Sequence, residues 1–298
     1  MAKKQDTQDR RGLTKREMHQ VDLLDELRGQ DPDDRDVALV SQALALCPLP
    51  FRKPVGMKVE RQVRIPGGVM EVVFTYTGKK SGGGLAYGND AVLLDLLCSE
   101  ARRTKNPEIT FKKAYELLEL LGIESDGGKD YRELKARLLR ISNLHIHVER
   151  RGHVAVNLRV VDVTNMRTPS RKDIAKEKAG EHPILPYAIR LAPEFYADLM
   201  RNYVPIPNEV LLAFKGAPVE YSIAKFIIHR MRVSESESLI AWDEFQEERG
   251  SEDSNAKRFK VKVRNVLLKL QMVWPELSHS VSRERGGLRI RKPQGTLV

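Results

Sequence analysis

Residues 257–274 read KRFKVKVRNVLLKLQMVW, and this segment decides the fold because it separates two kinds of side chain. On a helix at about 100° per residue, the apolar side chains fall within a stripe roughly 120° wide. The stripe consists of Phe259, Val263, Val266, Leu267, Leu270, Val273 and Trp274. The cations spread over the remaining surface, with Val261 and Leu268 among them; they are Lys257, Arg258, Lys260, Lys262, Arg264 and Lys269. We therefore expect one side to pack on a protein core and the other to face a negatively charged partner.

The composition indicates a soluble globular protein. Of the 298 residues, 41% are hydrophobic and 31% are charged, which suits one large domain or two ordinary ones. No apolar run reaches about 18 residues and the first residues lack the apolar core of a signal peptide, so we expect a cytoplasmic protein with no membrane partner. The net charge is +10, and it is clustered: residues 235–253 are acidic, whereas residues 257–264 are basic. Such clustering favours a polyanionic partner.

Cys47 and Cys98 lack metal or redox spacing, which predicts two small buried hydrophobes.

The first half predicts an arm, a hairpin and three helices. Residues 1–35 are polar and predict a flexible arm, and residues 36–46 predict a short helix. Alternating residues 58–76 flank Pro66-Gly67-Gly68 and predict a hairpin. Helical periodicity then predicts helices capped by Asp90 and by Thr110, followed by DYRELKARLLRI at residues 130–141.

The third of these helices is followed by two strand-like runs. Its apolar stripe is Tyr131, Leu134, Leu138 and Ile141. LHIHVER and HVAVNLRVVDV follow, joined at residues 150–152, and predict a hairpin. Three helices and then a hairpin is the order of a winged helix, in which the third helix enters the DNA major groove and the hairpin, or wing, reaches the neighbouring backbone.

The same order of elements recurs in the second half. Residues 164–183 are polar and predict an exposed insertion, and residues 203–207, YVPIP, predict a domain boundary. Beyond it come two helices, the basic helix, and a hairpin around Gly286-Gly287. The fold class that we expect is therefore α+β: two tandem winged-helix domains over residues 36–203 and 204–298, with an N-terminal flexible arm and a small leading β-hairpin.

Several blocks of sequence resemble the RepA-type plasmid replication initiators. The first blocks are LPFRKP from Leu49, GLAYG at 84–88, SEARR at 99–103 and the turn at Leu120-Leu121-Gly122. The C-terminal block is VPIPNEVLLAF…IAWDEFQEERG…KRFKVKVRNVLLKLQMVWPE…GGLRIRKP. Tyr221 and IIHR at 227–230 depart from the more aromatic helix expected there.

The resemblance implies a protein that binds repeated double-stranded sites (iterons) at its plasmid origin, promotes strand opening and takes part in copy control. It also implies recruitment of the host initiator and replicative helicase, and a homodimer in equilibrium with monomers that represses its own gene. We expect no catalytic residues, cofactor or metal, because the sequence carries no catalytic constellation.

The predicted DNA contacts come from both basic helices and the second wing. For the C-terminal domain they are Lys257, Arg258, Lys260, Lys262, Arg264, Arg283, Arg285, Arg289 and Arg291. For the N-terminal domain they are Arg132, Lys135 and Arg140, on a helix that could instead serve dimerisation. Phosphate contacts would position the protein and base contacts would give specificity.

Other interpretations stay open at this point. The first is a sequence-specific transcriptional repressor without an initiator role. The second is a metal-dependent rolling-circle nuclease, because His145 and His147 face the same way on a strand. A basic helix lying on a membrane surface is a third. Separately, Gln20, Asp22, Leu23 and Leu24 resemble a segment that docks on the replicative sliding clamp, which would be a further host partner.

Overall fold

The structure is a computed structural model that describes most of the chain from Val37 onward. The described residues are 37–65, 68–79, 83–113, 115–121, 123, 128–150, 155–165, 172, 175–176, 179, 187–214, 216–233, 237–249, 255–273 and 277–292. The predicted flexible arm, with its clamp-like segment at residues 20–24, lies outside these residues.

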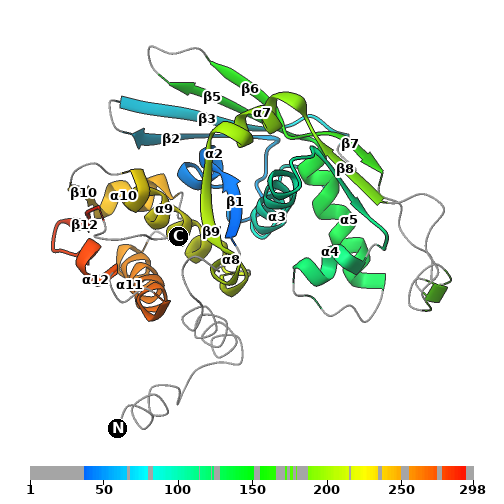
Figure 1. The fold of residues 1–298 in the computed structure, drawn as a ribbon. Coiled ribbons are helices and arrows are strands. Elements are labelled where there is room, and N and C mark those ends of the chain that lie inside the picture. Colours follow the sequence, from blue (N-terminus) through cyan, green and yellow to red (C-terminus); the bar gives the residue numbers. More distant parts are fainter. Residues whose placement is uncertain are drawn as a thin grey trace, which may run out of the picture.

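A four-stranded antiparallel sheet covers the top of the molecule in Figure 1. Its strands are β2 (Lys58–Ile65), β3 (Gly68–Tyr76), β5 (Leu144–Arg150) and β6 (Val156–Arg159), in the order β2-β3-β5-β6. The predicted leading hairpin is confirmed, since β2 pairs with β3 from Lys58 to Ile65. Alternate residues such as Val72 and Phe74 are fully buried, so one face of the sheet packs on the core.

The first winged helix follows the leading hairpin. It comprises α3 (Asp90–Arg103), β4 (Glu108–Phe111), α4 (Tyr115–Leu120), α5 (Gly128–Ser142), β7 (Val161–Asn165) and β8 (Tyr187–Leu191). The predicted apolar stripe of α5 is confirmed, because Tyr131, Leu134, Leu138 and Ile141 are all buried. The helix predicted to begin at Thr110 was wrong at its start. Residues 108–111 alternate in burial and pair with β8, so they form a strand.

The strands at the wing position of this domain are not the ones that the sequence analysis predicted. The predicted wing at residues 144–163 contains β5, β6 and the start of β7, and β5 pairs along its length with β3 of the leading hairpin. Strands β7 and β8 instead close a three-stranded sheet with β4, in the order β4-β8-β7. The wing position therefore belongs to the β7–β8 connection, which carries the predicted insertion at 164–183. Thr164 and Asn165 of that stretch still belong to β7.

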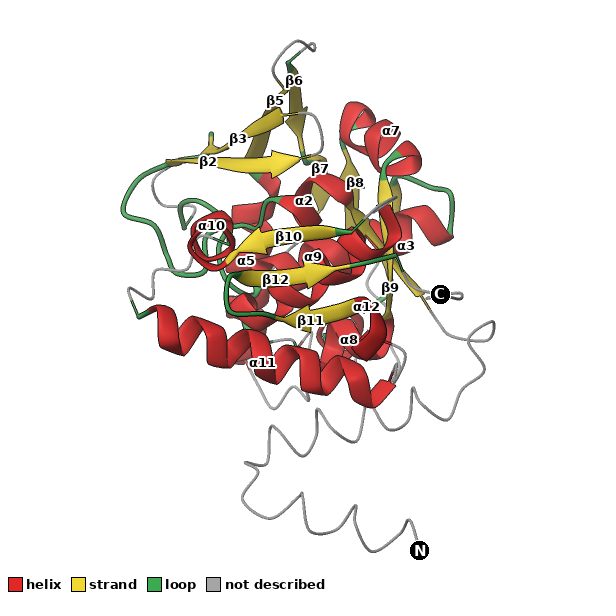
Figure 2. Ribbon diagram, turned by 90° about the vertical axis from the view of Figure 1, so that its left-hand side faces the viewer, coloured by secondary structure: helices red, strands yellow, loops and turns green. Residues whose placement is uncertain are grey.

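The second winged helix repeats this arrangement near the C-terminus (Figure 2). Its elements are α9 (Pro218–Val233), β10 (Ser238–Ala241), α10 (Trp242–Glu248), α11 (Ala256–Val273), α12 (Leu277–Ser280), β11 (Val281–Arg283) and β12 (Gly287–Ile290). The strand order is β10-β12-β11, which matches β4-β8-β7 position for position. A Cβ atom at Gly287 would lie only 2.0 Å from the Ile240 carbonyl oxygen, so glycine permits the close approach of β12 to β10.

The two winged helices share elements at their junction. These are β1 (Val37–Ser41), α2 (Gln42–Leu46), α7 (Pro193–Arg201), β9 (Tyr203–Pro207) and α8 (Asn208–Ala213). The predicted helix at 36–46 was wrong in its first half, because β1 pairs antiparallel with β9 over five residues. The predicted domain boundary at 203–204 falls inside β9. The buried core runs without a break from β1 to β12.

Polar groups buried between the two halves fix their arrangement. Asp95 of α3 lies 2.6 Å from the Lys225 ammonium nitrogen of α9, and the Tyr221 hydroxyl donates to the same carboxylate at 2.7 Å. The fully buried Arg249 guanidinium donates to the carbonyl oxygens of Ala45 and Leu46. Breaking such contacts would leave buried charges unpaired, so the two winged helices are held in one relative orientation.

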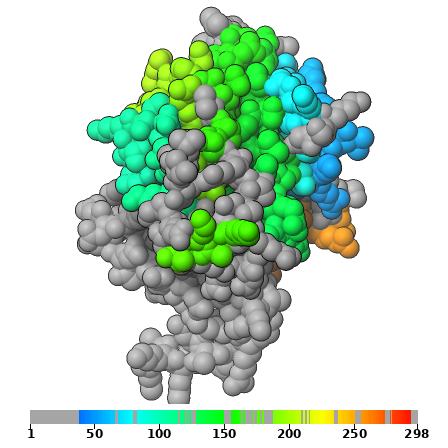
Figure 3. Space-filling view, turned by 90° about the vertical axis from the view of Figure 1, so that its right-hand side faces the viewer, coloured from blue at the N-terminus to red at the C-terminus, as the bar shows by residue number. Residues whose placement is uncertain are grey.

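The described surface on the side of the first winged helix is formed mainly by parts of the chain that precede the second winged helix (Figure 3). Figure 3 shows this face, on which the C-terminal residues appear only as an orange edge. The prediction for the cysteines is confirmed, because both are buried. Burial raises the pKa of the Cys47 thiol to about 12, so this group is an inert hydrophobe.

Candidate nucleic-acid interface

Helix α11 presents the predicted division between an apolar and a basic side. Phe259, Val263, Val266, Leu267 and Leu270 are buried. The ring of Phe259 meets that of Phe245 edge-on at 5.5 Å between centroids, which anchors the helix on α10. At its start, the Asn255 side-chain oxygen accepts hydrogen bonds from the backbone N–H groups of Lys257 and Arg258, at 3.0 and 3.3 Å.

The predicted cations of α11 differ in their exposure to solvent and in their contacts with other side chains. Lys257, Arg258 and Arg264 are exposed and form no ion pair with any residue that the structure describes. Lys260 lies with its ammonium nitrogen 5.3 Å from the Trp242 ring centroid, and Lys262 is half-buried. Three of the five predicted side chains therefore reach solvent without a competing partner.

The cations of the second wing divide in the same way. Arg283 and Arg285 are exposed beside the β11–β12 turn and have no ion pair within the described part of the chain. Arg289 instead forms ion pairs with Glu237 and Glu284, and Arg291 pairs with Glu237. Since their charges are already neutralised by carboxylates, Arg289 and Arg291 stabilise the hairpin and are weaker candidates for DNA contact than predicted.

Trp242 joins the helix to the wing. Its indole N–H donates to the Glu284 carbonyl oxygen at 2.9 Å, and its ring carries Lys260. Figure 2 shows the β11–β12 turn at the same end of the domain as the start of α11. The exposed cations of α11 and of the β11–β12 turn are therefore grouped together as one basic surface at this end of the domain (Figure 2). This C-terminal basic surface consists of Lys257, Arg258, Lys260, Arg264, Arg283 and Arg285.

The centre of the outward face of α11 is not basic. Val261 is 54% exposed and Leu268 is 50% exposed, and both lie directly opposite the buried stripe together with the exposed Asn265. The sequence pattern predicted Val261 and Leu268 among the cations, but it did not predict that they lie at the centre of the exposed face. Asn265 was missed because an uncharged residue gives no signal in a charge pattern. In a major groove, an amide reads adenine and an apolar side chain meets the thymine methyl group.

The first winged helix offers a weaker surface. Arg132 of α5 is exposed and Lys135 is half-buried. Arg137 pairs with Glu133 at 3.2 Å. Arg140 is only 6% exposed, its Nε donates to Asp90 at 2.6 Å, and its guanidinium carbon lies 4.8 Å from the centre of the Tyr87 ring. The structure therefore removes Arg140 from the predicted DNA contacts and makes it a packing residue between α5 and α3.

The paired histidines lie in the four-stranded sheet rather than in a wing. His147 Nδ1 is 2.7 Å from the Asn157 side-chain oxygen on the neighbouring strand. Burial and the charge of Arg159 lower the pKa of His145. Within the described ranges, no group of three or more His, Cys, Asp or Glu side chains is arranged to hold a metal ion. Nor does any described helix combine the length and apolar character needed to cross a membrane.

Comparisons with known proteins show the fold. No protein-family model matches the chain, and no curated protein matches it. Two crystal structures of domains 2 and 3 of RctB do match. One has a TM-score of 0.54 at 13% identity and covers 86% of this chain and 100% of that chain. The other also has a TM-score of 0.54, at 12% identity, and covers 85% of this chain and 97% of that chain. The chain therefore has an α+β fold similar to that of RctB domains 2 and 3.

Proposed function

We propose that this protein is a plasmid replication initiator that binds repeated double-stranded sites at the origin of its plasmid. In this proposal the second winged helix is the main reading domain, with α11 in the major groove and the β11–β12 wing on the adjacent backbone. The protein has no catalytic role of its own. DNA-binding energy and recruited host proteins open the strands.

The C-terminal basic surface is the observation that carries the proposal. A helix of eighteen residues is anchored by its apolar stripe, and its outward face carries unpaired cations around an exposed asparagine and two aliphatic side chains. Cations at the edges fit phosphates, whereas amide and apolar groups at the centre fit base edges. A face built only for solubility would not need exposed aliphatic side chains at its centre.

Two further features favour an initiator over a DNA-binding protein with only one winged-helix domain. The structural match to RctB domains 2 and 3 covers 86% of this chain and so extends over both winged helices, which supports an initiator-like architecture at the level of the fold. The sequence blocks that resemble RepA-type initiators extend over both halves. We propose that the first winged helix contributes Arg132 and Lys135 to weaker DNA contact or serves a homodimer.

Footprinting on the DNA that flanks the gene tests the proposal. We expect protection of several short repeats of one sequence, with the N7 atoms of guanines in the major groove shielded from methylation. Asn265→Ala should lose discrimination at one base pair, whereas Lys257→Ala should weaken binding to all sequences alike. Protection of a single site, or of no defined site, would contradict origin binding.

A minimal plasmid separates the initiator from the repressor. It carries only this gene, its flanking repeats and a selectable marker, in a host that cannot otherwise replicate it. Autonomous replication that is lost in Arg258→Ala/Arg264→Ala supports the initiator. Repression of a reporter without replication would instead establish a transcriptional repressor. Magnesium- or manganese-dependent nicking of supercoiled DNA that depends on His145 would establish the nuclease.

We also propose the host partners that this role requires. These are the host initiator, the replicative helicase and, through residues 20–24, the sliding clamp. A clamp pull-down compares the full chain with a chain lacking residues 20–24. Equal recovery of the clamp by the two chains would end the proposal for that segment without affecting origin binding.

A further inference from the structure

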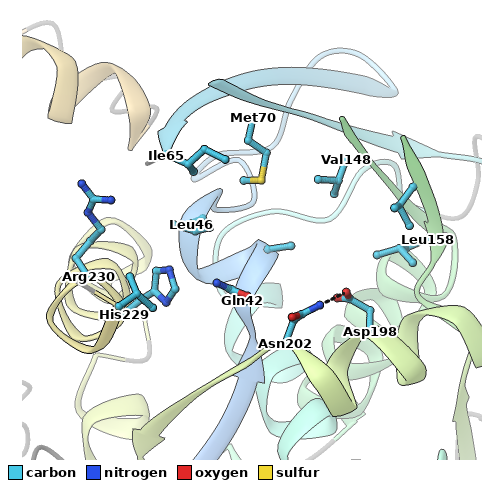
Figure 4. A pocket seen from close by; sticks show the side chains of 13 residues that line it. Gln42, Leu46, Ile65, Met70, Val148, Leu158, Asp198, Asn202, His229 and Arg230 are labelled. Atoms are coloured by element: carbon cyan, nitrogen blue, oxygen red, sulfur yellow. Dashed lines mark hydrogen bonds between the residues drawn. The ribbon is translucent and has the colours of Figure 1, made fainter. Parts of the chain in front are cut away.

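A cavity of about 490 Å³ lies between α9 of the second winged helix and the junction helices α2 and α7, against the inner face of the four-stranded sheet (Figure 4). Its apolar wall is formed by Leu46, Ile65, Met70, Val148 and Leu158, which come from α2 and from all four strands. This is the part of the inner sheet face that the packed helices leave uncovered. The volume falls within the range of roughly 300–1,000 Å³ that is typical of small-molecule sites, which are common at domain interfaces.

Two polar side chains face this cavity without a hydrogen-bond partner. His229 of α9 is only 3% exposed, yet its imidazole forms no hydrogen bond with any described residue. The Gln42 side-chain amide of α2 likewise has no partner in the described part of the chain. Figure 4 shows both side chains directed into the space between α9 and α2. A nearly buried imidazole without a partner is unusual, so His229 can bind a group that the protein itself does not supply, and the half-buried Gln42 offers a second donor beside it.

The charges around the cavity favour an anion near His229. Burial, which is the largest cause, and the charges of Arg230, Arg249 and Arg232 together lower the pKa of His229 to about 4. The ring is therefore neutral at pH 7 and lies in a positive field. Arg230 lies at the edge of the cavity, and its buried Nε atom lacks a hydrogen-bond partner.

The opposite wall carries a carboxylate that is already engaged. Asp198 of α7 accepts a hydrogen bond from the Asn202 side-chain amide at 2.9 Å, and the dashed line in Figure 4 marks this contact. Both residues line the cavity across from α9. The charged environment is thus positive on the α9 side and occupied by a hydrogen-bonded pair on the α7 side, so an anionic group fits only next to α9.

We propose that this cavity binds a small amphiphilic carboxylate. The apolar body of the ligand packs on Met70, Val148 and Leu158, and its carboxylate accepts hydrogen bonds from His229 and Gln42 on the side of Arg230. Such a ligand contacts the four-stranded sheet, the junction helix α2 and α9 of the second winged helix, so it bridges the first half of the chain and the second DNA-binding domain. The inference does not depend on which DNA sequence the protein reads.

Sodium decanoate is the probe for this site. Titration calorimetry at pH 7.5, below the micellar concentration, should show saturable one-to-one binding with a submillimolar dissociation constant. Leu158→Trp, which fills the apolar wall, should abolish binding. Glu71→Ala, next to Met70 but on the exposed face of the same strand, is the matched control and should bind decanoate as the wild type does. Decanoate that fails to saturate the wild-type protein would overturn the proposal.

The head group is tested separately on the wild-type protein. We expect bound decanoate to raise the pKa of His229, observed in the imidazole proton resonance that His229→Gln removes, because a nearby carboxylate favours the protonated ring. Arg230→Gln should weaken decanoate binding about tenfold, as expected for loss of one charge-assisted interaction. Decanol that binds as tightly as decanoate, or an unmoved His229 pKa, would refute the carboxylate site.

Discussion

Removing two unpaired arginines from the C-terminal basic surface should change how DNA binding depends on salt. Five of its cations, namely Lys257, Arg258, Arg264, Arg283 and Arg285, are exposed and have no ion pair with a described residue. If each neutralises one phosphate, the logarithm of the affinity falls with the logarithm of the salt concentration with a slope of about −4.5. Between about 50 and 200 mM KCl, the wild-type protein should therefore lose affinity about 500-fold.

The double variant Arg258→Ala/Arg264→Ala retains three of these contacts. Its slope should be about −2.7, and it should lose affinity only about 40-fold over the same range of salt. Fluorescence anisotropy with a labelled duplex from the flanking DNA measures both slopes.

The matched control removes the same charge from parts of the chain outside the second winged helix. Arg103→Ala/Arg159→Ala deletes two arginines that are already paired with Glu100 and Asp162. We expect this control to keep the wild-type slope. Equal slopes for the wild type and for Arg258→Ala/Arg264→Ala would place these two arginines outside the interface and refute the reasoning.

Three further predictions concern buried groups. Asp95→Ala leaves Lys225 buried and unpaired, and should lower the free energy of unfolding by about 3–5 kcal/mol in urea denaturation, whereas Asp95→Leu/Lys225→Met should regain most of the loss; equal stability of the two variants would contradict this. Arg140→Ala leaves Asp90 unpaired and should cost about 3 kcal/mol of stability while the salt slope of DNA binding stays unchanged; a changed slope would return Arg140 to the interface. The folded-state pKa of His229, about 4, lies below its ordinary value of 6.5, so its contribution is present above pH 6.5 and is lost as the pH falls toward 4. This should amount to about 3 kcal/mol between those limits, and His229→Gln should flatten that part of the stability profile in urea denaturation; an unchanged profile would show that another group causes the loss.

The parts of the fold predicted correctly are those in which local periodicity matches the buried face. The stripes of α5 and α11 were predicted because residues at helical spacing all face one core. The β2–β3 hairpin was predicted because alternation and a Pro-Gly-Gly turn lie next to each other in the chain. In each case the information is contained within about twenty residues.

The errors come from partners that are distant in the sequence. Residues 37–41 form a strand because they pair with β9, and β5 joins the leading hairpin because it pairs with β3. Arg140 was predicted to be a surface residue because helical spacing does not show that its side chain contacts Asp90, which lies fifty positions earlier in the sequence. The sequence could likewise not divide the basic residues into paired and unpaired ones, as with Arg289 and Arg264. That division depends on where each carboxylate lies in space.

The contact between α2 and Arg249 of the second winged helix has a consequence for how genes of this kind are cut and recombined. A gene fragment that begins at residue 204 would encode the whole second winged helix but not residues 37–46, whose carbonyl groups hold the Arg249 guanidinium. In the product the Arg249 guanidinium would lack its hydrogen-bond acceptors, and the apolar surface that residues 37–46 normally cover would be exposed. Such a product should precipitate or be degraded. An exchange of DNA specificity between relatives would therefore succeed when both residues 37–46 and the second winged helix are transferred. These two segments of the gene lie almost five hundred base pairs apart.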